Sequence, residues 1–128
     1  MRSDNEQLPI GVEVETLYID EQSDPDNHRY VFSYHITITN RLTEPVQLLS
    51  RYWCITDGDG GQQEVQGEGV VGAKPRIAPG DSYSYSSGTV IATEVGSMEG
   101  YYDMRTDDGS HFKAPIAPFT LAVPRALH

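Results

Sequence analysis

The segment from Tyr30 to Asn40 constrains the fold of this chain more than any other part of the sequence. Aromatic and β-branched residues alternate there, position by position, with a second set that is mostly polar. Strict period two over that length is typical of a β-strand with one buried face. We therefore expect a long strand, and the residues on its buried face are Tyr30, Phe32, Tyr34, Ile36 and Ile38.

Shorter runs of the same character lie on both sides of this segment. They predict strands at residues 10–19, 46–56, 62–65, 83–85, 100–106, 111–114 and 119–123. In the first run the apolar parity changes from Val14 to Leu17, so we expect a bulge near Thr16 or Leu17. In the second run we expect a buried inner face, and its residues are Leu49, Trp53 and Ile55.

Turn residues separate these runs. Asp-Gly pairs at residues 57–61 and the segment 107–110 predict two hairpins. Pro79-Gly80 has the residues of a type II turn. Pro115 and Pro118 lack the N–H that a sheet requires, so their segment is expected at an edge or a bend.

Seven or eight short strands separated by such turns predict an all-β sandwich or barrel. A length of 128 residues favours one domain, 1–128, with residues 1–8 as a mobile tail and residues 20–29 as a surface loop. The chain carries 9 basic and 19 acidic residues, a formal charge of −10, which opposes binding to nucleic acids and anionic membranes. No apolar run approaches the roughly 18 residues of a membrane span. With Cys54 as the only cysteine and no signal-peptide pattern, we expect a cytoplasmic protein.

The segment 67–72 matches the six-residue dinucleotide fingerprint in its letters. That mechanism needs a helix directly after the turn, whereas Ala73-Lys74-Pro75 follows here and Lys74 is pushed toward extended geometry. We interpret the segment as a tight loop in which glycines allow close backbone packing. We also hypothesise that it forms one rim of a partner-binding surface, steering an acidic protein segment or a polyphosphate, and the rim residues are Gly67, Gly69, Gly72, Lys74 and Arg76.

Other candidate sites are weaker. Asp57, Asp59 and Glu68 fit an EF-hand count, but Gly61 and Gln62 stand where a ligand and a glycine are required. A second acidic cluster lies in the predicted surface loop and allows weak, hydrated Mg²⁺ contact; its members are Asp20, Glu21, Asp24 and Asp26.

The remaining candidates for reactive groups are histidines, the cysteine and serines. The histidines lack metal-ligand spacing and are expected on the surface or in strands; they are His28, His35, His111 and His128. Cys54 is expected as a buried, inert thiol, and the serines as the polar face of a tyrosine-bearing strand; they are Ser84, Ser86 and Ser87. We therefore expect no catalytic residues, no bound cofactor and no dedicated metal site.

Several spaced motifs resemble the ApaG (CorD) family of bacteria. They are Trp53-Cys54-Ile55-Thr56-Asp57, the segment 65–72, Pro75 with Pro79-Gly80, Tyr85-Ser86-Ser87-Gly88, the segment 96–104 and Phe119-Thr120-Leu121. The resemblance runs from about Val12 to Pro124 with the motif order intact. It implies a fibronectin type III or immunoglobulin-like sandwich of seven to eight strands, without a catalytic residue set.

The same resemblance implies a class of function. Domains similar to ApaG in some eukaryotic F-box proteins and in a polymerase-interacting protein serve as protein-binding modules, and the name CorD is associated with cobalt resistance and magnesium efflux. We expect a non-enzymatic module that binds an unidentified protein. The alternative is a small-ligand binder for phosphate-rich nucleotides or divalent cations.

Overall fold

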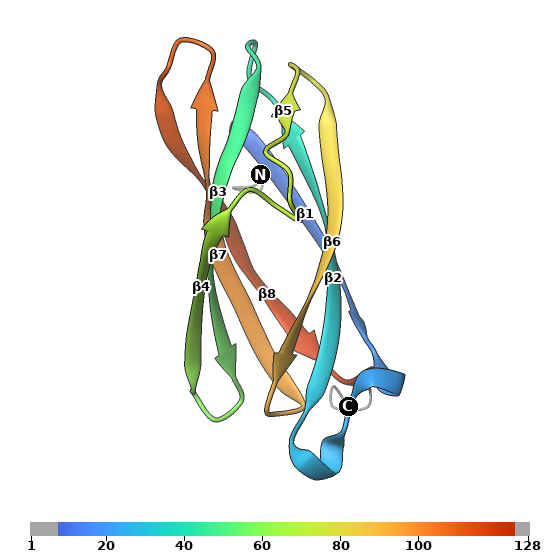
Figure 1. The fold of residues 1–128 in the computed structure, drawn as a ribbon. Helices are drawn as coiled ribbons and strands as arrows, with labels where there is room; N and C mark the ends of the chain where they lie inside the picture. The colour runs from blue at the N-terminus through green and yellow to red at the C-terminus, as the bar shows by residue number, and fades with distance from the viewer. Residues whose placement is uncertain (1–7, 125–128) are drawn as a thin grey trace, which may run out of the picture.

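The computed structural model describes residues 8–124, which form two antiparallel sheets packed face to face (Figure 1). The strands in chain order are β1 (Ile10–Tyr18), β2 (Tyr30–Asn40), β3 (Val46–Asp57), β4 (Gln62–Glu68), β5 (Arg76–Ile77), β6 (Ser82–Ile91), β7 (Val95–Thr106) and β8 (His111–Ala122). Two short 3-10 turns, η1 (Asp20–Gln22) and η2 (Pro25–Asn27), occupy the predicted surface loop. The predicted tail lies outside the described residues except for Leu8.

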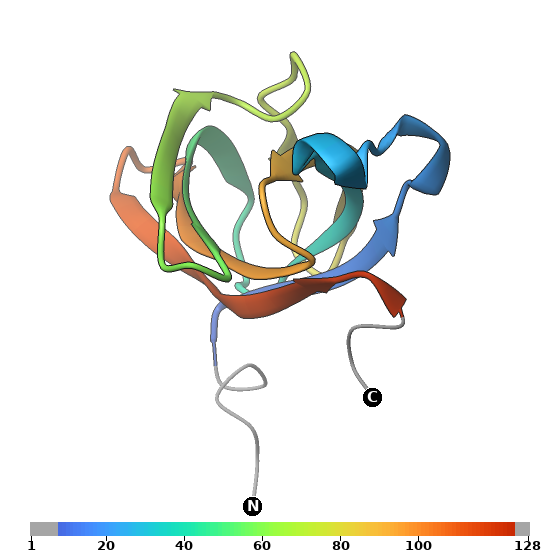
Figure 2. The same ribbon diagram turned by 90° about the horizontal axis from the view of Figure 1, so that it is seen from below.

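The strand order is β1-β2-β6 in one sheet and β4-β3-β7-β8 in the other, with β5 paired to β3. The chain therefore crosses between the sheets several times, as it does in fibronectin type III-like sandwiches, and the predicted all-β sandwich is confirmed. Each sheet has two edges, so the sandwich has two open sides. One lies between β4 and β6, the other between β1 and β8 (Figure 2).

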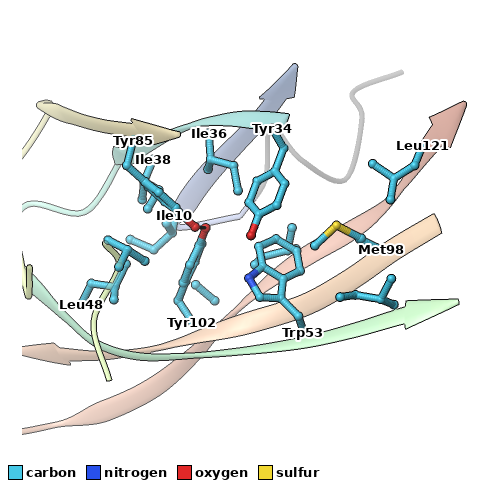
Figure 3. Close-up of a cluster of buried hydrophobic side chains, with 14 of the residues drawn as sticks. Ile10, Tyr34, Ile36, Ile38, Leu48, Trp53, Tyr85, Met98, Tyr102 and Leu121 are labelled. Atoms are coloured by element: carbon cyan, nitrogen blue, oxygen red, sulfur yellow. Dashed lines mark hydrogen bonds between the residues drawn. The ribbon is translucent and has the colours of Figure 1, made fainter. Parts of the chain in front are cut away.

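Large side chains from the inner faces of both sheets fill the space between them. All five residues predicted for the inner face of β2 are buried, and Trp53 on β3 is only 1% exposed, as predicted. The Tyr34 ring meets the Trp53 ring edge-on at 5.5 Å between centroids. The hydroxyls of Tyr85 on β6 and Tyr102 on β7 are 2.6 Å apart (Figure 3), and this hydrogen bond joins the sheets inside the core. Burial raises the pKa of both phenols, so both remain neutral at ordinary pH.

The predicted bulge near Thr16 or Leu17 is wrong. The β1–β2 pairing runs without interruption from Ile10 opposite Asn40 to Tyr18 opposite Phe32. Tyr18 keeps the inward parity, because its ring packs on Phe32 with centroids 5.3 Å apart. Leu17 consequently points outward and is 63% exposed.

A bulge occurs in β3 instead, where the pairing with β7 shifts between Leu48 and Ser50. Leu49 is the extra residue, half-buried, and Leu48 is the residue that enters the core with no exposed surface. The prediction that Leu49 lies in the core is therefore corrected. The bulge changes the parity of the strand, so that Val46 and Leu48 before it and Trp53 and Ile55 after it all face inward.

The two strands predicted at 111–114 and 119–123 are one long edge strand, β8, which contains both prolines. Its pairing with β7 shifts between Met98 and Gly100, opposite residues 116–119, so the prolines sit at an edge and beside an irregularity, as predicted. The strand predicted at 62–65 extends further, to Glu68. The Pro79-Gly80 turn is confirmed, since Gly80 has φ +80° and the Asp81 N–H donates to the Ala78 carbonyl.

Candidate binding groove

The glycine-rich segment is a tight turn between β4 and β5. Val70 and Ala73 exchange main-chain hydrogen bonds of 2.8 and 3.0 Å around Val71 and Gly72, which both have positive φ, +48° and +79°. That pattern is a type I′ turn. The amide of Gly69 donates to the Leu49 carbonyl at 2.8 Å. The amides of Gly69, Val70 and Ala73 are therefore engaged inside the protein, and no helix follows the turn.

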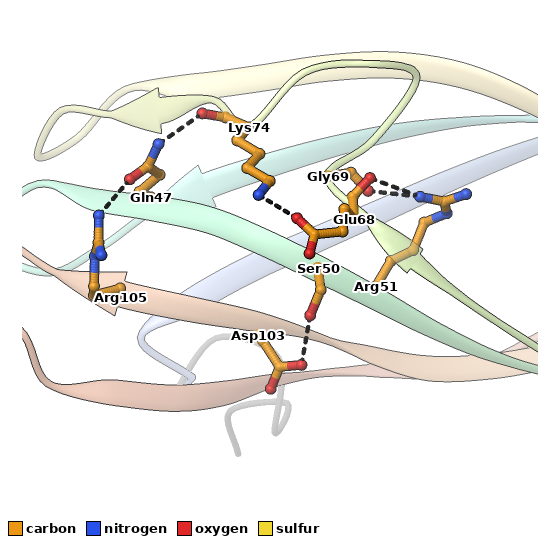
Figure 4. Close-up of polar contacts among 8 residues, drawn as sticks. All are labelled: Gln47, Ser50, Arg51, Glu68, Gly69, Lys74, Asp103 and Arg105. Atoms are coloured by element: carbon orange, nitrogen blue, oxygen red, sulfur yellow. Dashed lines mark hydrogen bonds and ion pairs between the residues drawn. The ribbon is translucent and has the colours of Figure 1, made fainter.

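Close packing explains two of the glycines. Gly69 has φ +61°, and a Cβ there would lie 2.3 Å from the Ala73 carbonyl oxygen. At Gly67 a Cβ would lie 2.8 Å from the Arg51 guanidinium. That guanidinium crosses Gly67 and donates to the carbonyls of Glu68, at 3.2 Å, and Gly69, at 2.8 Å (Figure 4). Arg51 thus ties the start of the loop to β3.

The two cations of the predicted rim each pair with a carboxylate. Lys74 pairs with Glu68 across the loop, and hydrogen bonding from Lys74 lowers the pKa of the Glu68 carboxyl (Figure 4). Arg76 pairs with Asp107 in the β7–β8 turn. Both pairs are exposed, and exposed ion pairs contribute little stability because water and salt screen them. Lys74 and Arg76 therefore serve two separate pairs and do not form a common positive patch.

The structure does not bring the EF-hand-like carboxylates together. Asp57 begins the β3–β4 turn, where its Oδ1 accepts hydrogen bonds from the amides of Asp59 and Gly61, each 2.9 Å long. Glu68 lies at the other end of β4 with Lys74. Within residues 8–124, no group of three or more His, Cys, Asp or Glu side chains is arranged to hold one metal ion. The acidic residues of the 20–29 loop are exposed.

Cys54 is half-buried, and the prediction of a buried core thiol is corrected. It follows Trp53 and precedes Ile55, both inward, so its side chain lies on the outer face of the sheet. Ser84 and Ser86 lie on the outer face of β6, bonded to Thr37 and His35. Ser87 differs from its prediction, because it is half-buried on the inner parity of β6. His28 and His111 are exposed, as predicted, and His128 lies outside the described residues.

A groove runs along the open side between β4 and β6. Its upper part, at the Arg51 end, has a volume of about 470 Å³, and its lower part, at the Asp57 end, about 510 Å³. The two parts share Ile55, Gln63 and Val90. We call the two parts together the β4–β6 groove. The upper part is lined by Tyr34, Arg51, Trp53, Ile55, Gln63, Val65, Ser87, Gly88, Thr89, Val90 and Met98.

The groove has an apolar floor and mixed walls. Trp53, Ile55 and Met98 lie at its base and are at most 5% exposed. Val65 from β4, 36% exposed, stands on one wall, and Ser87 and Thr89 from the inner face of β6 stand on the other. The glycine-rich loop crosses from β4 toward β6 above the groove (Figure 1), and Arg51 contacts both the loop and the groove lining. Arg51 therefore links the start of the loop to the upper end of the groove, but none of the five predicted rim residues is among the residues that line either part.

Two strained residues flank this groove. Val71 at the tip of the loop and His28 in the lower lining are the non-glycine residues with positive φ in the part of the chain that is described, at +48° and +54°. Val71 is β-branched and 66% exposed, so neither propensity nor burial explains its conformation. Strain of this kind concentrates at functional sites.

The sequence analysis missed the groove residues Arg51, Val65 and Val90. In the sequence, one signal points to each of the two valines. Val65 is the single aliphatic residue in the otherwise polar or glycine segment 62–68, and Val90 stands beside Ile91 against the alternation of β6. Neither signal reveals a groove by itself, because the groove depends on which strands lie at the sheet edges.

The chain is thus a fibronectin type III-like sandwich with a groove along one open side. Residues 20–106 match the model of the ApaG domain. The chain is 60% identical over 119 residues to Protein ApaG of Ectopseudomonas mendocina and 57% identical over 119 residues to that of Azotobacter vinelandii, covering 93% of this chain and 94% of each relative. A solved structure from Bordetella pertussis, 46% identical and covering 92% of this chain and 96% of that one, superposes with a TM-score of 0.89. The chain belongs to the ApaG family.

The structure adds one observation on membranes. Among residues 8–124, no helix has the length and apolar character that a membrane crossing requires.

Proposed function

We propose that this chain is a non-enzymatic protein-binding module whose binding surface is the β4–β6 groove. The observation that carries the proposal is the groove itself, with a buried aromatic floor, the exposed Val65 on one wall and an exposed edge strand beside it. Binding sites typically combine an apolar base with a few polar groups. Here Arg51, Gln63 and Ser87 supply the polar groups.

We further propose that the glycine-rich loop is the upper rim of this surface, with Gly67, Gly69, Gly72, Lys74 and Arg76 as predicted. Because both cations already pair with carboxylates, their effect on a partner is electrostatic steering rather than tight binding. Val71 adds an exposed apolar contact at the tip. Weak contact of this loop with polyphosphate or divalent cations stays a prediction, and its engaged amides favour a protein partner over a phosphate group.

The cellular setting is part of the proposal. We place the protein in the cytoplasm, on the grounds of its single cysteine and its acidic composition. The family resemblance connects it with cobalt resistance and magnesium efflux. In this proposal the connection arises through a bound protein and not through a metal site of its own.

Site-specific photo-crosslinking in cells tests the binding surface. A photoreactive residue is placed at Gln63 in the groove and, as a matched control, at His35, which is exposed on the outer face of the other sheet. We expect a discrete protein adduct from the Gln63 variant and none from the His35 variant. Equal adducts at both positions, or none at Gln63, would refute the groove as the binding surface.

A further inference from the structure

The main chain of β4 has a free edge. The Asp57 amide donates to the Gly61 carbonyl just before the strand, and the Gly69 amide donates to the Leu49 carbonyl just after it. Antiparallel pairs alternate between bonded and non-bonded positions, so these two bonds assign the odd-numbered residues of β4 to bonding with β3. The even-numbered residues Gln62, Glu64 and Gln66 then direct their main-chain groups away from β3.

Within residues 8–124 no further strand pairs with this edge, and its upper end is engaged by Arg51, which donates to the Glu68 carbonyl. β4 is the last strand of its sheet, and six of its seven residues are exposed. Edge strands in soluble proteins are commonly blunted by proline or lysine, and β4 contains neither. The natural complement of a row of unpaired amides and carbonyls is another extended strand.

From these observations we propose that an extended polypeptide segment bearing basic residues pairs with the free edge of β4 and places an apolar side chain in the β4–β6 groove. The inference rests on the proposed function and specifies the mode of binding. Residues on the inner face of the added strand lie beside Gln63 and Val65, which line the groove above Trp53. One apolar side chain of the added strand then contacts Val65 on one wall and Thr89 on the other.

The charges near the groove favour β4 over β6 as the pairing edge, and they favour a basic segment as the partner. Glu64 and Glu68 lie on β4, whereas β6, the other edge of the groove, carries no charged residue. The chain as a whole has a formal charge of −10. A segment with lysine or arginine facing Glu64, and facing Glu68 in competition with Lys74, is therefore attracted to β4, and raising the salt concentration weakens the attraction.

A second copy of this chain is a poorer occupant of the same edge. Two β4 strands pairing antiparallel about Gln66 would place Glu64 of each opposite Glu68 of the other, and pairing about Glu64 would place Glu64 opposite itself. Pairing about Val65 would place each of these glutamates opposite a glutamine, and that register is opposed by net charge alone. Like charges directly opposite each other destabilise strand pairs. The net charge of the two chains adds to the repulsion.

Peptide selection followed by NMR tests the proposal. A phage-displayed library of random linear peptides is selected on the intact chain, and the strongest binder is synthesised and titrated into the labelled protein. We expect selected peptides in which apolar and basic residues alternate. Shifts are expected at residues 62–68 and 87–90, with slower exchange of the Glu64 and Gln66 amides once the peptide is bound.

Matched variants separate main-chain pairing from side-chain contact. Gln66→Pro removes a free-edge amide and is expected to weaken the peptide about tenfold, whereas Gln66→Ala, which keeps that amide, is expected to bind within about threefold of wild type. Val65→Ala weakens binding through the groove wall. The amide spectrum of each variant, recorded before titration, identifies any that has lost its fold; the exchange measurement on wild type does not depend on the variants.

Other outcomes overturn the proposal. Peptide shifts confined to the outer face around Tyr52 and Tyr101, or to the loop around Val71, would reject strand addition, while crosslinking at Gln63 would still support the groove as a protein-binding surface. Concentration-dependent shifts at 62–68 without peptide would identify a second copy as the occupant and reject the basic segment. Failure to select any peptide would also reject it, and the crosslinking result would then decide the proposed function separately.

Discussion

The two open sides of this sandwich are built differently. On the β1–β8 side, the edge strand β8 carries Pro115 and Pro118, which have no amide to offer a further strand. The depression there is lined mainly by apolar groups, among them Val12, Val14 and Phe119. On the β4–β6 side, the edge strand is polar, exposed and free of proline, and the groove beside it contains arginine, glutamine and serine side chains.

This difference indicates that strand addition is discouraged at one edge and permitted at the other. A sandwich protected only by its overall charge would show no such asymmetry. The prolines of β8 act locally, because each removes one donor from that edge and leaves the rest of the molecule unchanged. The open edge of β4 therefore stands out as a feature of this fold that its stability alone does not require.

The largest expected effect concerns the floor of the β4–β6 groove. Trp53→Ala removes a ring that is 1% exposed and packs edge-on against Tyr34, Tyr102 and Phe119. We expect the free energy of unfolding to fall by about 3–5 kcal/mol, measured by urea denaturation. On the β1–β8 side, Ile116→Val, at a residue 3% exposed, is expected to cost about 1 kcal/mol.

Trp53→Phe is the control for this prediction. The indole Nε1 is a buried polar atom without a hydrogen-bond partner among the described residues, so phenylalanine loses ring contacts but no hydrogen bond. Its cost should therefore lie well below that of alanine. Equal costs for the two substitutions would contradict the view that burial of an aromatic ring at this position accounts for the loss.

Proline placed on β4 gives the next largest effect and copies the protection of β8. Val65 pairs with Trp53 at a hydrogen-bonded position, so Val65→Pro breaks the ladder and is expected to cost about 2–3 kcal/mol. Gln66 directs its amide to solvent, so Gln66→Pro should stay within about 1 kcal/mol of wild type. Denaturation of both variants measures the difference, and comparable losses would contradict the assignment of the free edge.

The strands of the sandwich show how much of the fold the sequence predicts. Alternation in 30–40 correctly predicts β2 and its core face, and the burial of Trp53 follows from its strand. Parity fails in β3, because Leu48 and Leu49 are equally apolar and only the bulge decides which one enters the core. It fails in β1 because Tyr18 is as suitable for the core as Leu17.

The groove could not be predicted from the sequence, for a physical reason. A groove between two edges depends on which strands end each sheet, and that order is set by crossovers between distant segments. The sequence predicts the glycine-rich segment as a tight loop, and Arg51 links that loop to the upper end of the groove. Its ion pairs could not be predicted, because Arg76 meets Asp107 from a different turn.

A smaller effect on stability is expected at Val71, the strained residue at the tip of the glycine-rich loop. Val71 occupies the first central position of a type I′ turn, which favours asparagine followed by glycine, and Gly72 already follows. Val71→Asn should raise the free energy of unfolding by about 1 kcal/mol by relieving the strain. Thermal denaturation checks this, with Val90→Asn as a surface control outside the turn. A loss of stability in Val71→Asn would show that the valine makes contacts that outweigh its strained backbone.

The smallest effect is electrostatic and lies at the point where the rim meets the free edge. Hydrogen bonding from Lys74, and then its charge, lower the pKa of Glu68 below the ordinary value of 4.5. A carboxyl with a lowered pKa in the folded state contributes stability that is present above its unfolded pKa and is lost as pH falls through its folded pKa. The contribution therefore disappears on acidification below about pH 4.5, and not on the alkaline side.

In Lys74→Met the Glu68 pKa should return to its ordinary value, as followed by NMR titration of the side-chain carboxyl. Arg76→Met, which removes the cation of the other pair, should leave the Glu68 titration unchanged. High salt should also reduce the shift in the wild-type chain, because the pair is exposed. If Glu68 titrates identically in wild type and Lys74→Met, the loop leaves that carboxylate unengaged, and an arriving basic segment meets no competition from Lys74 at the edge of β4.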